Sequence, residues 1–561
     1  MDKRFFFERN LLALSRTDPA LCSRLSLAET TLNRYKFLES RSGEIVPALV
    51  TPDGGARPLH SLVDPQKEGR RFITTCEKEG FLIFLGLGGG FAAAAALERE
   101  DVYRVVVIDY DINGMAELFC SREYINILGD PRFRLLVDSP GEMITGYILE
   151  NYQPVFSGGI RMLPLRTRTE WDPARFGEAG GAVEAALEAV SADYSVQAYF
   201  GTRWFSNIIR NIFRAEKPYR PIPPIRRAAV CAAGPSLDIQ IPRLLERRRE
   251  LFIFAADTSL PSLLLRGLKP DAVVSIDCQH ISYYHFMEGL PRGVFLFPDL
   301  ASPPLVASRS EQPYFFSGGH PLARYISRRW RPLPEVDTAG ANVTYAALSL
   351  ADNLGAGEIE LYGADFSYPL GRSYARGTYI YPYFENRQNR LTPLEGLVSA
   401  FLYRSPLVKR EKAGDWYPNT WYPNTWYYET RPLTMYRRGV EEKKFRAALL
   451  PVPGLGPPLV IRKTREPAPP GELPLFAAGK ASLGAGEFLD LYRRDIRALP
   501  LPRGGPAAYL EKLNAREKQI LTTLIPEAAA IKRRRPELNT GELLEAVRDY
   551  CTGEIDRVLQ F

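Results

Sequence analysis

The chain has 561 residues, 45% of them hydrophobic, which is long enough for two or three domains with separate cores. Its 72 basic and 65 acidic residues lie scattered or in short clusters, a pattern that argues against nucleic-acid or membrane binding. The six cysteines have no paired spacing, which fits neither a disulfide framework nor a zinc site and indicates reduced thiols. No apolar run reaches the roughly 20 residues of a membrane span, and the N-terminus lacks a signal-peptide pattern. We therefore expect a soluble, cytoplasmic protein.

Two proline-rich stretches, residues 216–227 and 451–474, divide the chain, because proline lacks the amide donor of a helix. We expect three parts: a Rossmann-like N-terminal domain with linking helices over 1–215, a central α/β domain over 216–450, and a proline-rich linker with a helical domain over 451–561. The linking helix, residues 180–217, is expected to break near Gly201. Helical periodicity marks three segments of the last part, at 486–499, 507–525 and 540–560.

The first part contains one β-α-β unit. An apolar strand from residue 80 runs into a glycine turn and an alanine-rich helix, and a second strand ends at Asp109. In a Rossmann-type layout the glycines let a ligand approach the backbone and the acid holds a ribose hydroxyl. The pattern resembles the nucleoside site of class I methyltransferases. Since residues 121–143 offer no obvious catalytic group, a domain used for binding or scaffolding is favoured over a working methyltransferase.

The central part begins with a strand, residues 227–234, that ends in a Gly-Pro-Ser turn before a helix. Gly234 permits a tight turn, Pro235 fixes φ for the first helical residue, and Ser236 offers a hydroxyl at the helix N-terminus. Exposed amides at a helix N-terminus attract phosphate, so the turn predicts a phosphate site. The alternative is that Ser236 only caps the helix.

Further polar residues follow other strands of this part, and parallel α/β sheets bind ligands beyond the carboxyl ends of their strands. Asp257, Thr258 and Asp277 follow two strands, and Asp365 follows a third at 358–363. Together with the Gly-Pro-Ser turn they outline a nucleotide pocket. Two more candidates, Thr338 and Asn342, stand at the start of a long apolar helix and can point at the same ligand.

A loop after Asp365 is crowded with tyrosines and arginines: Tyr368, Arg372, Tyr374, Arg376 and Tyr379. A phenol donates one hydrogen bond and a guanidinium donates two, so these side chains suit a departing phosphate. An ordinary surface loop is the alternative.

Three segments of the central part, residues 230–238, 255–277 and 340–367, together resemble the motility accessory factor (Maf) glycosyltransferases. Those enzymes share a domain with MptE-like 6-hydroxymethylpterin pyrophosphokinases, and the resemblance covers about residues 200–430. It implies a sialyltransferase-like α/β domain that moves a nonulosonic acid, such as pseudaminic or legionaminic acid, from a CMP-activated donor. The implied acceptor is serine or threonine of flagellin in the cytoplasm.

The resemblance also implies site residues, by analogy with bacterial sialyltransferases that use CMP-sialic acid. The implied CMP-binding residues are Gly234, Pro235, Ser236, Asp257, Thr258, Thr338, Gly340, Asn342, Gly363, Asp365 and Phe366. Tyr374 matches one of two tyrosines that stabilise the leaving phosphate. The other position holds Ser367, with Tyr368 next to it.

The general base is expected to be a histidine, whose ordinary pKa suits removal of the proton from the acceptor hydroxyl. Three of the four histidines lie in the central part. His280 is the first choice and His320 the second, although each of them, and His285, has a structural role as the alternative. Asp277 is expected to stabilise the oxocarbenium-like transition state electrostatically. The acids are too dispersed to predict a metal site.

Residues 415–430 repeat Trp-Tyr-Pro-Asn-Thr with a period of five, which matches neither helix nor strand. An acceptor-facing loop is favoured over a duplicated surface flap. Two other functions stay open: a 6-hydroxymethylpterin pyrophosphokinase-like enzyme, and a non-catalytic motility factor that binds flagellin or a sugar nucleotide. The pyrophosphokinase would need acids that hold magnesium, and the doubled acid of the pterin enzymes is absent from "SIDCQ".

Overall fold

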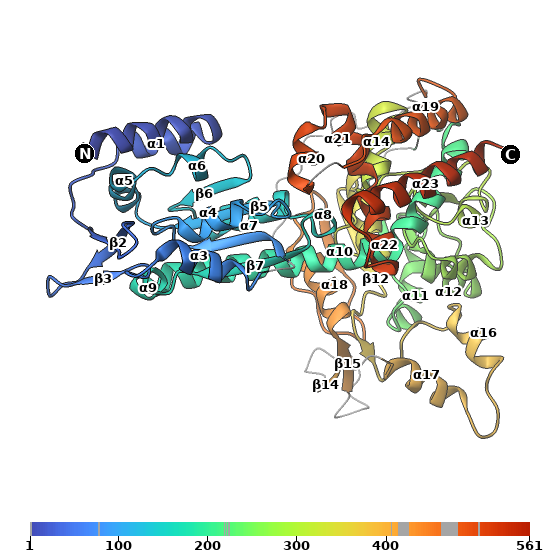
Figure 1. Ribbon diagram of the computed structural model, residues 1–561. Helices are drawn as coiled ribbons and strands as arrows, with labels where there is room; N and C mark the ends of the chain where they lie inside the picture. The colour runs from blue at the N-terminus through green and yellow to red at the C-terminus, as the bar shows by residue number, and fades with distance from the viewer. Residues whose placement is uncertain are drawn as a thin grey trace. The chain divides into compact units, whose positions relative to one another are not determined.

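The fold is taken from a computed structural model of the chain. The structure describes residues 3–560 except 77–78, 218, 220–221, 223–224, 405–406, 413–425, 462–480 and 503–504. Contacts divide the chain into two units (Figure 1). The first unit contains residues 1–201, 498–521 and 525–549, and the second contains 202–497, 522–524 and 550–561. The C-terminal helices, which the sequence assigned to a domain of their own, are thus shared between the two units.

The first unit is built on a four-stranded parallel sheet in the order β6-β5-β4-β7, as expected for a Rossmann-like domain. Its strands are β4 (Glu79–Leu85), β5 (Arg104–Asp109), β6 (Phe133–Val137) and β7 (Gly159–Pro164). A small antiparallel sheet holds β1 (Tyr35–Glu39), β2 (Ile45–Val50) and β3 (Ala56–Pro58). The helices are α1 (Lys3–Thr17), α2 (Pro19–Ser26), α3 (Pro65–Ile73), α4 (Phe91–Leu97), α5 (Ile112–Ser121), α6 (Ile125–Leu128), α7 (Gly141–Asn151), α8 (Pro154–Ser157), α9 (Arg166–Trp171), α20 (Pro506–Lys512) and α22 (Ile525–Arg534).

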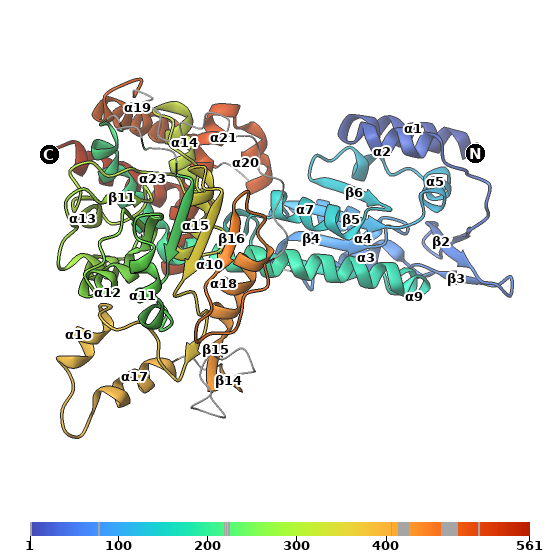
Figure 2. The same cartoon turned by 180° about the vertical axis from the view of Figure 1, so that it is seen from behind.

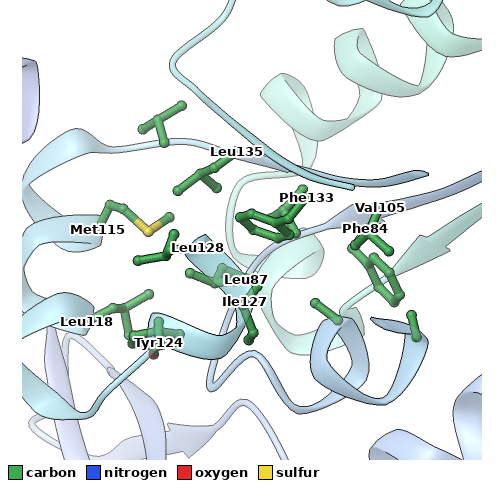
Figure 3. Close-up of a cluster of buried hydrophobic side chains, with 14 of the residues drawn as sticks. Phe84, Leu87, Val105, Met115, Leu118, Tyr124, Ile127, Leu128, Phe133 and Leu135 are labelled. Carbon is green, nitrogen blue, oxygen red and sulfur yellow. The ribbon is translucent and has the colours of Figure 1, made fainter. Parts of the chain in front are cut away.

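Both faces of the sheet are buried at β4, β5 and β6, which explains why these strands are almost continuously apolar. Successive side chains of a strand point to opposite faces, so Leu82 and Phe84 enter one core cluster while Phe81 and Ile83 enter another. Figure 3 shows the first of these clusters, with Phe84 and Val105 of the strands on one side and Met115 of α5 on the other.

Four helices contribute residues to both units: α10 (Pro173–Ala215), α19 (Ala485–Ala498), α21 (Ala515–Thr523) and α23 (Thr540–Leu559). The expected break of α10 near Gly201 is wrong, because the helix runs through this residue without interruption. A Cβ atom at position 201 would stand 1.9 Å from the carbonyl oxygen of Pro526. Gly201 therefore serves a close backbone approach and not a turn.

The second unit contains a six-stranded parallel sheet in the order β11-β10-β9-β8-β12-β16. Its strands are β8 (Arg227–Cys231), β9 (Phe252–Ala256), β10 (Ala272–Ser275), β11 (Phe295–Pro298), β12 (Glu358–Tyr362) and β16 (Ala448–Pro451). The chain builds outward from β8 through β11 and then returns to the other side of β8 with β12. The carboxyl ends of β8 and β12 therefore mark the switch point of a doubly wound sheet.

Helices cover this sheet, and Figure 2 shows α15 lying across it, in contact with β8, β9, β10 and β12. The helices are α11 (Leu237–Glu246), η1 (Asp257–Ser259), α12 (Leu260–Leu265), η2 (His280–Phe286), α13 (Pro304–Ala307), α14 (Pro321–Arg329), α15 (Val343–Asn353), α16 (Ile380–Glu385), α17 (Leu394–Leu402) and α18 (Arg431–Glu442). A second sheet, in the order β13-β15-β14, holds β13 (Tyr368–Pro369), β15 (Trp426–Thr430) and β14 (Val408–Lys412). None of the helices in the described part of the chain combines the length and apolarity of a membrane span.

Candidate functional site

The switch point between β8 and β12 is closed by a hydrogen-bonded pair, Ser236 and Asp365. The Ser236 amide donates to Asp365 Oδ2 at 2.9 Å, and the Ser236 hydroxyl donates to Oδ1. Leu455 in turn donates its amide to the Ser236 hydroxyl at 2.6 Å. Both polar side chains are buried, and burial raises the pKa of Asp365 to about 6.

The Gly-Pro-Ser turn fits this closure. A Cβ at Gly234 would stand 2.3 Å from Asp365 Oδ2, and a Cβ at Gly363 would stand 2.4 Å from the carbonyl oxygen of Ala232. The first amides of α11 bond to Asp365 and to carbonyls of the turn, so a phosphate there would have to displace the Asp365 carboxylate. Ser236 does not cap α11 through its hydroxyl either. The nucleotide-binding roles of Gly234, Pro235, Ser236, Gly363 and Asp365 stay predictions.

The carboxyl ends of β9 and β10 are joined through Asp257, which is buried. Its Oδ2 accepts a hydrogen bond from the Ser275 hydroxyl at 2.7 Å. Its Oδ1 accepts from the amide of Thr258 at 2.7 Å and from the hydroxyl of Thr258 at 3.1 Å. Asp257 thereby fixes Thr258 at the edge of the sheet where ligands of this fold class bind.

Thr258 leads to a histidine and two tyrosines. Its Oγ1 lies 3.4 Å from Nε2 of His285, while Nδ1 of His285 has no hydrogen-bond partner among the described residues. The His285 ring meets the ring of Tyr379 edge to face, with 4.9 Å between centroids. Tyr379 lies 6.4 Å from Tyr374 by the same measure. We call Thr258, His285, Tyr374 and Tyr379, with Asp277, the strand-end cluster.

Asp277 belongs to this cluster because its carboxyl group interacts electrostatically with His285. Burial raises the pKa of Asp277, and the nearby carboxylate of Asp257 also raises it. The hydrogen bond that the Gln279 amide donates to Asp277 lowers this pKa. Two side chains from distant helical regions complete the surroundings. Burial raises the pKa of Tyr436 in α18, with an added contribution from Asp277. Arg404 opposes the burial-driven rise of the pKa values of Tyr374 and Tyr379.

The two histidines that the sequence favoured as the base have other surroundings than His285. His280 is exposed at the start of η2. His320 begins α14, where Nδ1 accepts the amide hydrogen of Leu322 at 3.2 Å and the ring meets Trp204 edge to face. Burial lowers the pKa of His320 to about 3, so its ring stays neutral. The structure thus brings His285, and not His280 or His320, against Thr258 and Tyr379.

Thr338, Gly340 and Asn342 shape the start of α15. The Thr338 hydroxyl donates to the carbonyl oxygen of Gly318 at 2.7 Å. Asn342 caps the helix, since its Oδ1 accepts from the amide of Tyr345 at 2.9 Å and its Nδ2 donates to the carbonyl oxygen of Gly340 at 2.8 Å. These contacts are structural, and a role at a nucleotide stays a prediction.

The loop after Phe366 is anchored to α11. Phe366 is buried and takes a positive φ of 44°. Arg372 forms an ion pair with Asp238, which also accepts the amide hydrogen of Arg376 at 3.1 Å. The Arg372 guanidinium is therefore bound to a carboxylate of the protein, which leaves the tyrosines as the prominent groups of this loop.

Sequence reasoning missed Ser275, Arg404 and Tyr436 altogether. Ser275 precedes Asp277 by two residues, and the alternation of a strand could have directed it toward the same region. Arg404 and Tyr436 are brought in from segments that carry no recognisable motif. Among the described residues, no group of three or more His, Cys, Asp and Glu side chains is arranged to hold a metal ion. The Trp-Tyr-Pro repeat lies outside the described residues except for its last part, which forms β15.

In the first unit, the residues of the resembled nucleoside site bond to the protein itself. Asp109 forms a buried ion pair with Arg168 at 3.0 Å and accepts the amide hydrogen of Leu87 at 2.8 Å. The amide of Gly89 donates to Nε2 of His60 at 2.9 Å. The glycine turn and the acid thus hold each other and their neighbours in place, which favours a scaffolding role.

Comparison with known families agrees with this architecture. Residues 206–371 match the family model described as 6-hydroxymethylpterin diphosphokinase MptE-like. The chain contains an MptE-like domain. This domain holds β8 to β12 and the Asp257, Asp277 and His285 part of the cluster, whereas Tyr374, Tyr379, Arg404 and Tyr436 lie beyond the matched residues.

The chain also resembles a solved structure along its whole length. The structure of MAf glycosyltransferase from Magnetospirillum magneticum AMB-1 is similar over 100% of this chain and 96% of that one, with a TM-score of 0.54 and 12% sequence identity. At this identity the likeness concerns the fold. The resemblance to a Maf protein with an MptE-like domain is confirmed at that level.

Curated relatives include uncharacterized proteins of Treponema pallidum (strain Nichols). One is 32% identical over 139 residues, which is 24% of this chain and 66% of the relative. Another is 42% identical over 92 residues, covering 16% of this chain and 32% of the relative. The matches thus span between about a third and two thirds of the length of these relatives.

Proposed function

We propose that the protein is a glycosyltransferase that moves a nonulosonic, sialic-acid-like sugar from a CMP-activated donor to a serine or threonine hydroxyl of flagellin. The observation that carries the proposal is the strand-end cluster: an imidazole, two phenols and a carboxylate lie together at the carboxyl edge of a parallel sheet. The fold shared with a solved glycosyltransferase supports the same reaction class. A cytoplasmic reaction is part of the proposal.

The phenols suit the leaving group. Burial raises the pKa values of Tyr374 and Tyr379, so both side chains stay protonated at neutral pH and can donate hydrogen bonds to the departing phosphate. Arg404 adds a positive charge beside them, which favours the same anion.

His285 suits the general base. As the acceptor oxygen attacks the anomeric carbon, the imidazole takes the proton of that hydroxyl, and the bond from the sugar to the phosphate breaks. Nδ1 of His285 has no partner among the described residues, and Thr258 holds the other side of the ring. The carboxylate of Asp277 would stabilise the positive charge that develops on the sugar.

The test measures CMP release from CMP-activated pseudaminic or legionaminic acid. We expect release by the wild type and a loss of about 10²- to 10⁴-fold in His285→Ala, the usual contribution of a general base. His280→Ala is the matched control and should keep full activity, because the His280 side chain is exposed at the start of η2. Full activity of His285→Ala would overturn the base assignment. Binding of the donor without CMP release by the wild type would instead favour the non-catalytic motility factor.

A second candidate function is favoured by the description of the matched family. A 6-hydroxymethylpterin pyrophosphokinase needs carboxylates that hold magnesium against phosphates, and Asp257 and Asp277 follow neighbouring strands. Both oxygens of Asp257, however, already accept hydrogen bonds from Thr258 or Ser275. Release of AMP from ATP in the presence of Mg²⁺ and 6-hydroxymethylpterin would replace the transferase proposal with this one.

A further inference from the structure

Residues 380–404 and 407–412, here called the arm, contain α16, α17 and β14 and expose four large apolar side chains. Figures 1 and 2 both show α16 and α17 standing away from the six-stranded sheet. Leu391 is 92% exposed, Leu407 69%, Tyr403 58% and Tyr383 48%. Several large apolar side chains exposed on one segment indicate a surface that a partner covers.

The same arm is basic. Its exposed cations are Arg387, Arg390, Arg404, Lys409, Arg410 and Lys412, and its exposed acids are Glu385, Glu395 and Glu411. Among the ion pairs of the described residues, none includes one of these six cations. This excess of positive charge complements an acidic partner.

Three of the arginines are held by aromatic rings. The guanidinium of Arg387 lies 4.0 Å from the ring centroid of Tyr383, that of Arg404 lies 3.8 Å from Phe401, and that of Arg410 lies 4.0 Å from Trp426. Stacking fixes the plane of a guanidinium while its N–H edge can still donate to a carboxylate. The arm therefore offers oriented donors among exposed apolar side chains.

The arm is also connected to the strand-end cluster. Phe401 of α17 lies 6.4 Å from Tyr374 and 6.0 Å from Phe384 of α16, measured between ring centroids. Arg404 interacts electrostatically with Tyr374 and Tyr379. A chain bound along the arm would thus reach the groups that we assign to the reaction.

We infer that the arm docks the polypeptide acceptor, and that this acceptor carries acidic and apolar residues beside the hydroxyl that receives the sugar. The inference rests on the proposed function. A nucleotide sugar is small and polar, and it offers nothing that would cover large apolar side chains such as Leu391. A polypeptide with both kinds of residue matches the charge and the apolar surface together.

The test uses two synthetic fluorescent peptides of equal length, each with one threonine between leucines, flanked by glutamates in one and by lysines in the other. Binding to the full chain is followed by fluorescence anisotropy. We expect the glutamate peptide to bind more tightly than the lysine peptide. The double variant Arg387→Glu, Arg390→Glu should weaken its binding about tenfold, since two favourable charge contacts become repulsive. Leu391→Ser should also weaken it, with no risk to folding at a position that is 92% exposed.

Arg249→Glu is the matched control. This exposed arginine lies between α11 and β9, at the amino edge of the sheet, opposite the strand-end cluster. Unchanged binding by the double variant, or an equal loss in Arg249→Glu, would overturn the docking inference. Equally tight binding of a single-stranded RNA of the same charge, lost in the same variants, would overturn it in favour of a nucleic-acid site. The proposed function fails separately, by absence of CMP release, which requires no peptide.

Discussion

The buried carboxyl group of Asp299 makes the stability of the second unit depend on pH. Asp299 follows β11 and is buried, with Oδ1 accepting the amide hydrogen of Ala301 and Oδ2 that of Gly318, each at 2.7 Å. Burial raises the pKa of Asp299 to about 6, above its ordinary value of 3.8. Between these two values the folded protein binds more protons than the unfolded chain, so stability falls as pH rises through this window.

Asp299→Asn removes this titration while keeping the shape of the side chain. We expect the variant to lose about 1 kcal/mol at low pH, because an amide has only one acceptor oxygen for the two amides. Relative to wild type, the variant should then gain roughly 2 kcal/mol from about pH 4 to about pH 7 and become the more stable protein, because only the wild type must ionise a buried acid. Denaturant unfolding of both proteins across this range measures the difference. A difference that does not change with pH would show that Asp299 ionises normally.

Residues at strand ends could be located from the sequence, but their partners could not. Asp257, Thr258 and Asp277 follow strands that the apolar pattern identifies, and the structure places them at one edge of the sheet. The bond between Ser236 and Asp365 joins positions 129 residues apart. No local pattern reveals such a contact, because it depends on the return of β12 beside β8.

At the level of elements, the junction between β8 and β12 depends on glycine. Gly234→Ala should destabilise the protein by about 1–3 kcal/mol, since a Cβ would stand 2.4 Å from the carbonyl oxygen of Gly363 as well as against Asp365. Gly181→Ala is the control: it lies exposed within α10, and a Cβ there would have no heavy atom within 4 Å. It should gain about 0.5–1 kcal/mol through helix propensity. Thermal unfolding compares the two variants, and similar effects of both would contradict the close approach.

Six strands of the two parallel sheets, β4, β5, β8, β9, β10 and β12, were predicted from the sequence, because continuous apolar runs ending in glycine or acid are typical of buried parallel strands. No prediction was made for β6, β7, β11 or β16. Helix boundaries were less predictable. Residues 507–525 form α20 and α21, separated at Asn514, whose Oδ1 accepts the amide hydrogen of Glu517 at 3.0 Å. Asparagine is neutral within a helical pattern, so only the capping contact identifies the break.

At the scale of the whole molecule, the two parallel sheets differ in what occupies the ends of their strands. In the first unit the acid after β5, Asp109, is neutralised by Arg168, and the glycine turn after β4 donates to His60. In the second unit Nδ1 of His285 has no partner among the described residues, and Tyr379 stands beside it. A ligand at the first site would have to break a buried ion pair, which costs several kcal/mol when one charge is left alone.

Nucleotide binding should therefore be confined to the second unit. In a thermal-shift titration we expect CMP to stabilise the protein, by about 2.7 kcal/mol at a concentration 100 times its Kd, and S-adenosylmethionine to have no effect. Tyr379→Phe removes one donor and should weaken CMP binding about fivefold, the usual worth of one hydrogen bond. Tyr199→Phe changes the same atom on an exposed side chain and should bind CMP as the wild type does. If S-adenosylmethionine stabilises both the wild type and Tyr379→Phe, this prediction is wrong and the first unit has a nucleoside site. The ion pair between Arg168 and Asp109 would then have to open to admit the ribose.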